Sequence, residues 1–168
     1  MADAGASVAA SAGSGLNRAW LVHAARTAVA AVVSLYVARM CRLPEGYWAA
    51  VTTLVVMQST LGAALKVSGE RLAGTALGAV AGALLEQYFG ANGIAFGGGV
   101  FVLGLICAVL RLERNAYRYA GVTLAIVMLV TREGGVWAIA AHRFIEVSIG
   151  IVVGLVLTAV WPERTVAE

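Results

Sequence analysis

The stretch ERLAGTALGAVAGALL, residues 70–85, opens with an acidic and a basic residue and then places glycine at every fourth position of an apolar segment. Gly74, Gly78 and Gly82 would share one face of a helix, because residues four apart lie one turn above each other. A bare face lets two helix backbones approach closely in lipid, where apolar burial gives no net drive for association. The stretch predicts a membrane helix with a packing face, which is also compatible with a flat wall beside a narrow pore.

The composition of the whole chain is that of a membrane protein. Of its 168 residues, 61% are hydrophobic and 12% are charged, and the mean hydropathy is +0.87, whereas a soluble domain is about half apolar and about a quarter charged. The 12 basic and 9 acidic residues are scattered between apolar runs, without the basic clusters interleaved with aromatic residues that a nucleic-acid groove needs. We therefore expect the lipid bilayer as a partner and no nucleic acid.

The apolar runs predict an all-α polytopic membrane protein with about six transmembrane helices, since a helix needs about 20 residues to cross the hydrocarbon core. The expected spans are about 20–39, 47–65, 72–89, 93–110, 117–131 and 136–161. Residues 1–17 are rich in alanine, serine and glycine, which predicts a disordered tail. We expect one transmembrane domain over residues 18–162 and a short cytoplasmic tail over residues 163–168.

The basic residues predict the orientation of these spans. With six spans, the two termini and the loops 66–71 and 111–118 lie on one side, which carries eight basic residues, namely Arg18, Arg26, Lys66, Arg71, Arg111, Arg114, Arg118 and Arg164. The other side carries four, namely Arg39, Arg42, Arg132 and Arg143. The positive-inside rule then places both termini in the cytoplasm.

The opening stretch recurs in the second half of the chain. When ERLAGTALGAVAG (70–82) is laid over HRFIEVSIGIVVG (142–154), the matched residues are Arg71 with Arg143, Gly78 with Gly150, and Gly82 with Gly154. The preceding spans align at nearly the same spacing, 51–60 with 122–131, and we call the two pairings together the repeat alignment. Because each unit, about 18–90 and 91–162, holds three spans, we predict two inverted three-helix repeats, which in transporters enclose the site where they meet. The packing glycines are then Gly74, Gly78, Gly82, Gly150 and Gly154.

Arg143 is the charge that the topology explains least. Counting about 1.5 Å per residue from Val136, it lies about 10 Å into the sixth span, from the side where positive charge is disfavoured. A charge at this depth usually faces a partner or a wet cavity. Two interpretations stay open: an intrahelical pair with Glu146 at i+3, and an arginine that faces an anion. Arg71 is either a cytoplasmic anchor of the third span or a second member of the same pathway.

Polar residues interrupt the second and fifth spans at corresponding positions. The second span is apolar until Met57 and then carries Gln58, Ser59 and Thr60, and the fifth meets Thr131, Arg132 and Glu133. Interrupted helices at matching positions of two halves point to a transporter site, although a loop that begins at Thr131 explains the fifth span equally well. The candidate pathway residues are Arg71, Arg143, Gln58, Thr60, Glu146 and Arg132.

The segment YWAAVTTLVVMQSTLGAALKVSGERLAGTALGAVAGALL, residues 47–85, resembles the signature of the fusaric-acid-resistance or aromatic-acid-exporter (FUSC-like) superfamily, and more distantly the plant aluminium-activated malate transporters. The residues that carry the likeness are Tyr47, Trp48, Gln58, Leu61, Gly62, Arg71, Gly74, Thr75 and Gly78, with Arg143, Gly150 and Pro162 fitting in the second half. The resemblance covers about residues 20–162. It implies efflux of aromatic carboxylates in the bacterial inner membrane, or anion conduction as in the plant proteins.

Typical bacterial members are larger than this chain, with two membrane blocks and soluble cytoplasmic domains. The resemblance therefore also implies a homodimer that completes the assembly, and a periplasmic adaptor partner as in related efflux systems. We expect a transporter or channel for organic anions, and the alternative is a non-transporting membrane subunit or stability factor with the same fold.

Enzyme chemistry finds no support in the sequence. It contains no HExxH, no GxSxG and no glycine-rich phosphate loop after a strand. Cys41 and Cys107 have no CxxC spacing, and neither histidine has a second ligand at metal spacing. We expect no catalytic residues, no metal and no cofactor.

Overall fold

The computed structural model describes residues 2–58, 60–130 and 134–161, with side chains from Trp20 onward. These residues form six helices and no strand: α1 (Ala2–Met40), α2 (Tyr47–Val56), α3 (Leu61–Phe89), α4 (Gly93–Val109), α5 (Arg114–Leu129) and α6 (Val136–Val160). The predicted all-α class is confirmed. By length and composition, Trp20–Met40 and α6 are able to cross a membrane, and α2 and α4 are shorter apolar helices. The six-span topology stays a prediction.

The boundary between the second and third helices differs from the one predicted. The sequence predicts a span over 47–65 and a loop over 66–71, whereas α2 ends at Val56 and α3 begins at Leu61 and continues through Arg71. Met57 is extended, and the Thr60 hydroxyl accepts a hydrogen bond from the Ala63 N–H at 3.3 Å, which caps the new helix. The interruption that the polar residues from Gln58 to Thr60 predict is therefore confirmed, whereas the predicted continuation of the second span to residue 65 is wrong.

The other helix ends lie close to the predictions. α4 and α6 each end one residue before the predicted position, and α5 begins three residues earlier than expected, at Arg114. The backbone of α1 begins at Ala2, so the segment for which the composition predicts a disordered tail is continuous with this helix.

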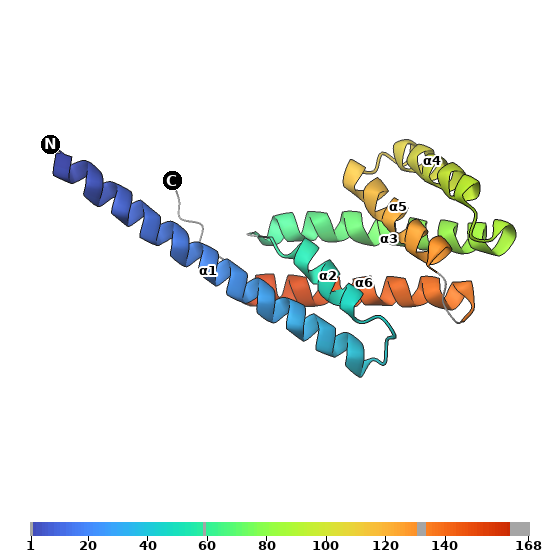
Figure 1. Cartoon of the computed structure of the whole chain (residues 1–168), viewed down its shortest axis with the longest axis horizontal. Coiled ribbons are helices and arrows are strands. Elements are labelled where there is room, and N and C mark those ends of the chain that lie inside the picture. The colour runs from blue at the N-terminus through green and yellow to red at the C-terminus, as the bar shows by residue number, and fades with distance from the viewer. Residues whose placement is uncertain (1, 59, 131–133, 162–168) are drawn as a thin grey trace.

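The helices α3 and α6 run antiparallel to each other at the centre of the bundle (Figure 1). The short helix α2 packs on α6, and α5 packs on α3, so each central helix holds a shorter helix from the opposite half of the chain. α1 covers α2 and α6, whereas α4 covers α5 and α3. The two halves of the chain are therefore interlocked.

Two apolar clusters occupy matching positions in the two halves. The first contains Val56, Ala64, Val147 and Ile151, with Val67 and Leu155 packed against it. The second contains Ala79, Ala83, Val127 and Ala140, with Val136 and Ile139. Extended to neighbouring residues, the repeat alignment pairs Val56 with Val127, Ala64 with Val136, Val67 with Ile139, Ala79 with Ile151 and Ala83 with Leu155. Five of the six members of each cluster thus have a counterpart in the other.

Candidate functional site

The glycine face of α3 lies directly against α5. A Cβ added at Gly78 would overlap the carbonyl oxygen of Ala120 and lie 2.9 Å from the Cβ of Thr123. Gly74 meets the same helix one turn earlier, and at Gly82 the added atom would lie 3.0 Å from the Val127 Cβ. At these three positions the backbones approach so closely that a side chain on α3 would have to displace α5.

The glycines of α6 make the corresponding contact with α2. A Cβ at Gly150 would overlap the carbonyl oxygen of Ala49 and lie 2.6 Å from the Thr52 Cβ. At Gly154 it would lie 3.0 Å from Val56 Cγ1. The repeat alignment relates the residues that these glycines contact to those on α5 that meet α3, namely Ala49 to Ala120, Thr52 to Thr123 and Val56 to Val127. These close contacts hold α2 and α5 beside the two arginine-bearing helices.

Arg143 lies inside the bundle, with 2% of its side chain exposed, and contacts both a carboxylate and an aromatic ring. Its Nη1 donates to Glu146 Oε2 at 3.1 Å, and Glu146 is itself 1% exposed. Its guanidinium carbon lies 3.9 Å from the ring centroid of Trp48 on α2. The Trp48 indole N–H donates to Glu45 Oε2 at 2.9 Å, which fixes the ring that faces the arginine. The site thus joins an internal ion pair to a cation–π contact.

Arg71 is also buried, with 7% of its surface exposed, and its described partners are neutral. Its Nε and Nη2 donate to the Thr52 hydroxyl at 3.2 and 3.1 Å. Its guanidinium carbon lies 4.9 Å from the ring centroid of Tyr119 on α5. Tyr119 corresponds to Trp48 in the repeat alignment, so each arginine stacks on an aromatic residue from the opposite half. The sequence predicts that Arg71 lies in a loop and anchors the end of the third span. This prediction is wrong, because α3 begins ten residues before Arg71.

The short helix α2 brings the two arginine sites together. Trp48 contacts Arg143 and Thr52 binds Arg71, and these two α2 residues lie one helical turn apart on the same face. The pair of arginines that the repeat alignment singles out is therefore connected through one short helix, with Glu146 beside one member.

The remaining candidate residues lie at the break between α2 and α3 or outside the described chain. The Gln58 side-chain amide donates to the Val55 carbonyl at 3.2 Å, and Thr60 caps α3. Within the described part of the chain, the hydrogen bonds of these residues stay within the break or reach α1, not the two arginines. Arg132 lies outside the described residues.

Arg26 on α1 is a buried residue whose position the sequence interpretation missed. It has no exposed surface, and its Nη1 and Nη2 donate to the main-chain carbonyls of Trp161 and Gln58, both at 2.8 Å. These carbonyls end α6 and follow α2, where helix ends carry unpaired acceptors and partial negative charge. In the sequence, Arg26 counts only as a basic residue that indicates topology. Its position six residues into the first apolar run is the feature that could have indicated its burial.

Known proteins resemble this chain over most of its length. The model of the fusaric acid resistance protein-like family matches residues 28–157. The inner membrane protein YeeA of Escherichia coli K12 is 30% identical over 148 residues, which cover 86% of this chain and 42% of that protein. The uncharacterized transporter YdhK of the same strain is 30% identical over 163 residues, 85% of this chain and 23% of that protein. No solved structure matches.

These similarities confirm the resemblance drawn from residues 47–85. One of these two relatives is named an inner membrane protein and the other a transporter. The chain spans less than half of the length of these two curated relatives.

Proposed function

This chain belongs to the fusaric acid resistance protein-like family, and we propose that it moves organic anions across the bacterial inner membrane. The observation that carries the proposal is the pair of buried arginines, Arg71 and Arg143, each stacked on an aromatic ring from the opposite half of the chain. Buried cations in an apolar bundle are costly and mark ion pathways in membrane proteins.

The chemistry of the two sites fits a carboxylate. A guanidinium group offers two parallel N–H donors that match the two oxygens of a carboxylate, and lysine has the charge but not this fork. Glu146 already supplies a carboxylate to Arg143, whereas Arg71 is held by a hydroxyl and a ring. We therefore assign the first contact with the substrate anion to Arg71, and the role of Arg143 depends on whether its bond to Glu146 opens. Aromatic carboxylates are the preferred class, because the rings beside both arginines offer a stacking surface.

The proposed architecture has six spans in two inverted repeats, both termini in the cytoplasm, and a homodimer as the working unit. The contacts that recur at positions paired in the repeat alignment support the repeat. With 10 and 16 residues, α2 and α5 are shorter than the roughly 20 residues of a full span, as expected for interrupted helices at corresponding positions. A periplasmic adaptor is a further proposed partner, and efflux is the proposed direction.

The test is flux into liposomes that contain the purified protein, with a panel of aromatic and dicarboxylic acids and with protein-free vesicles as the blank. We expect saturable movement of at least one carboxylate, a clear reduction in Arg71→Lys and near-complete loss in Arg71→Gln, with both variants folded. Parent-like flux in Arg71→Gln would refute the assignment of Arg71.

The second candidate is a non-transporting membrane subunit that keeps the same fold. The buried Arg143–Glu146 pair favours it, because an arginine neutralised within its own helix needs no external anion. Folded protein in liposomes with no flux of any acid in the panel would support this candidate over the transporter.

A further inference from the structure

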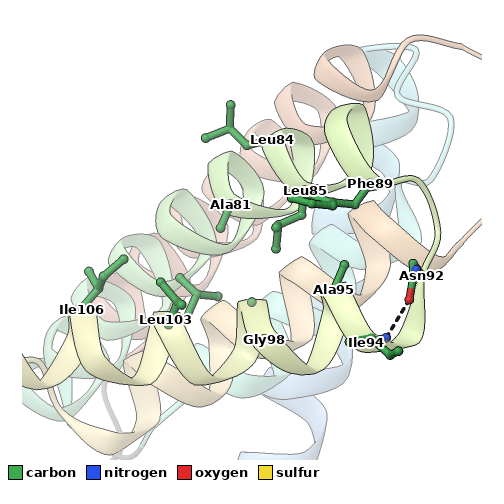
Figure 2. A pocket seen from close by; sticks show the side chains of 12 residues that line it. Ala81, Leu84, Leu85, Phe89, Asn92, Ile94, Ala95, Gly98, Leu103 and Ile106 are labelled. Atoms are coloured by element: carbon green, nitrogen blue, oxygen red, sulfur yellow. Dashed lines mark hydrogen bonds between the residues drawn. The ribbon is translucent and has the colours of Figure 1, made fainter.

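An apolar groove runs between α3 and α4 (Figure 2), and its lining shares no residue with the arginine sites. It has a volume of about 580 Å³. On the α3 side Leu85 and Phe89 extend toward it, and on the α4 side Ala95, Gly98 and Leu103 form its floor. Its rim reaches the surface of the protein, where Ile94 is 88% exposed. The groove is therefore open to whatever surrounds the helices.

The lining excludes a polar or charged occupant. The one residue of the lining with a polar side chain is Asn92, and its Oδ1 already accepts a hydrogen bond from the Ile94 N–H at 2.8 Å, which caps α4. A carboxylate in the middle of the groove would lose its water without gaining a donor, which is costly. The groove is thus not part of the anion pathway and suits a hydrocarbon.

The dimensions favour a single chain over a helix. From Asn92 to Ile106 the lining extends over fourteen residue steps along α4 and its cap, about 21 Å at about 1.5 Å per step. A volume of about 580 Å³ over this length gives a mean cross-section of about 28 Å². A helix about 10 Å wide needs about 80 Å², so the groove cannot enclose a helix of a second copy. One bilayer leaflet has about 15 Å of hydrocarbon, which makes the groove long enough for one lipid chain.

The counterpart of this region in the first half of the chain carries a large buried side chain. There α1 packs on α6 and carries the buried Arg26, and the repeat alignment, extended to these helices, places Gly97 and Gly98 where Arg26 stands. Among the described residues, no atom lies within 4 Å of a Cβ added at either glycine. Of the two glycines, Gly98 lines the space between α4 and α3, so this position lacks a side chain that would close it.

We propose that this groove binds one acyl chain of a membrane phospholipid, with the headgroup at the Gly90–Asn92 end. The proposal is independent of the anion-transport function, because it rests on the volume, length and lining of a separate region. The bound chain supplies packing that α4 lacks on its α3 side.

Two neighbouring glycines of α4 give a matched test. Gly98 lines the groove and Gly97 does not, and both have room for a side chain. Full-length parent, Gly98→Leu and Gly97→Leu are purified from membranes in the same mild detergent, and the phospholipid retained per chain is measured by native mass spectrometry and by extraction. We expect the parent and Gly97→Leu to retain at least one phospholipid per chain and Gly98→Leu to retain one fewer.

Several results would overturn the proposal. Equal phospholipid retention in all three proteins would show that the groove holds no lipid, and retention of free fatty acid alone would assign a different ligand. If Gly98→Leu, unlike Gly97→Leu, converts an oligomer to a monomer, then the occupant is a second copy of the chain. Ala95→Leu fills the same groove by another route, and misfolding of both filling variants beside a folded Gly97→Leu would show that the space is not open.

Discussion

Replacing Arg143 by glutamine should destabilise the protein much more than replacing Arg143 and Glu146 together. The two side chains are 2% and 1% exposed and bond at 3.1 Å. Removing one member of a buried ion pair leaves the other charge unpaired, which costs about 3 to 5 kcal/mol. Two glutamines are neutral and fit the same space, so the double variant should recover most of this loss, and we expect a coupling free energy of about 2 kcal/mol or more.

The single variant Glu146→Gln should be the milder of the two. It leaves Arg143 buried but still 3.9 Å from the centroid of the Trp48 ring. A cation–π contact contributes about 0.5 to 2 kcal/mol, which offsets part of the cost of losing the Glu146 carboxylate. In Arg143→Gln the stranded Glu146 carboxylate gains nothing comparable from the face of a ring, which attracts cations. The expected order of stability is therefore parent, Glu146→Gln, Arg143→Gln.

The assay is unfolding by a denaturing detergent in mixed micelles, followed for the parent, both single variants and the double variant, with anion flux measured on the same samples. The exposed pair Lys66–Glu113, 3.3 Å apart with side chains 65% and 61% exposed, is the control, and its coupling should be near zero and at most about 1 kcal/mol. If Arg143 and Glu146 only stabilise the fold, folding and flux should return together in the double variant. An anion-facing Arg143 predicts that flux stays lost, and a stable Arg143→Gln with full flux would refute both interpretations.

Three further predictions concern packing, the buried cap and topology. Gly78→Leu should prevent folding or assembly because α5 lies in van der Waals contact with this position, whereas Gly97→Leu should fold normally. Yield and gel filtration measure the difference, and a Gly78→Leu protein that behaves like the parent would show that Gly78 has no packing role. Arg26→Gln should lose the bonds to two helix-end carbonyls and cost about 1 to 3 kcal/mol in the same unfolding assay, and an unchanged midpoint would contradict this. In a cysteine-free background, single cysteines in loops 42–46 and 132–135 should react with an impermeant reagent from outside intact cells, and labelling of either terminus instead would reverse the orientation.

The sequence by itself determined the membrane class, the all-α fold, the family and the repeated pairs of residues. These properties depend on composition and on short patterns, such as the apolar runs and the glycines four residues apart, which act within a few turns of one helix. The repeat was visible because Arg71 and Gly78 recur as Arg143 and Gly150 at a constant spacing. The ends of α4 and α6, within one residue of the prediction, have the same local origin.

Only the tertiary structure decided what those residues contact. The polar residues from Gln58 to Thr60 predict an interruption of the second span, but the immediate start of α3 at Leu61, capped by Thr60, was not predicted. The burial of Arg26 depends on the ends of α2 and α6, which lie 32 and 135 residues away in the chain. Trp48 and Tyr119 became partners of the arginines because the two halves interlock. Contacts between residues so far apart are set by packing of the whole bundle, and no local pattern encodes them.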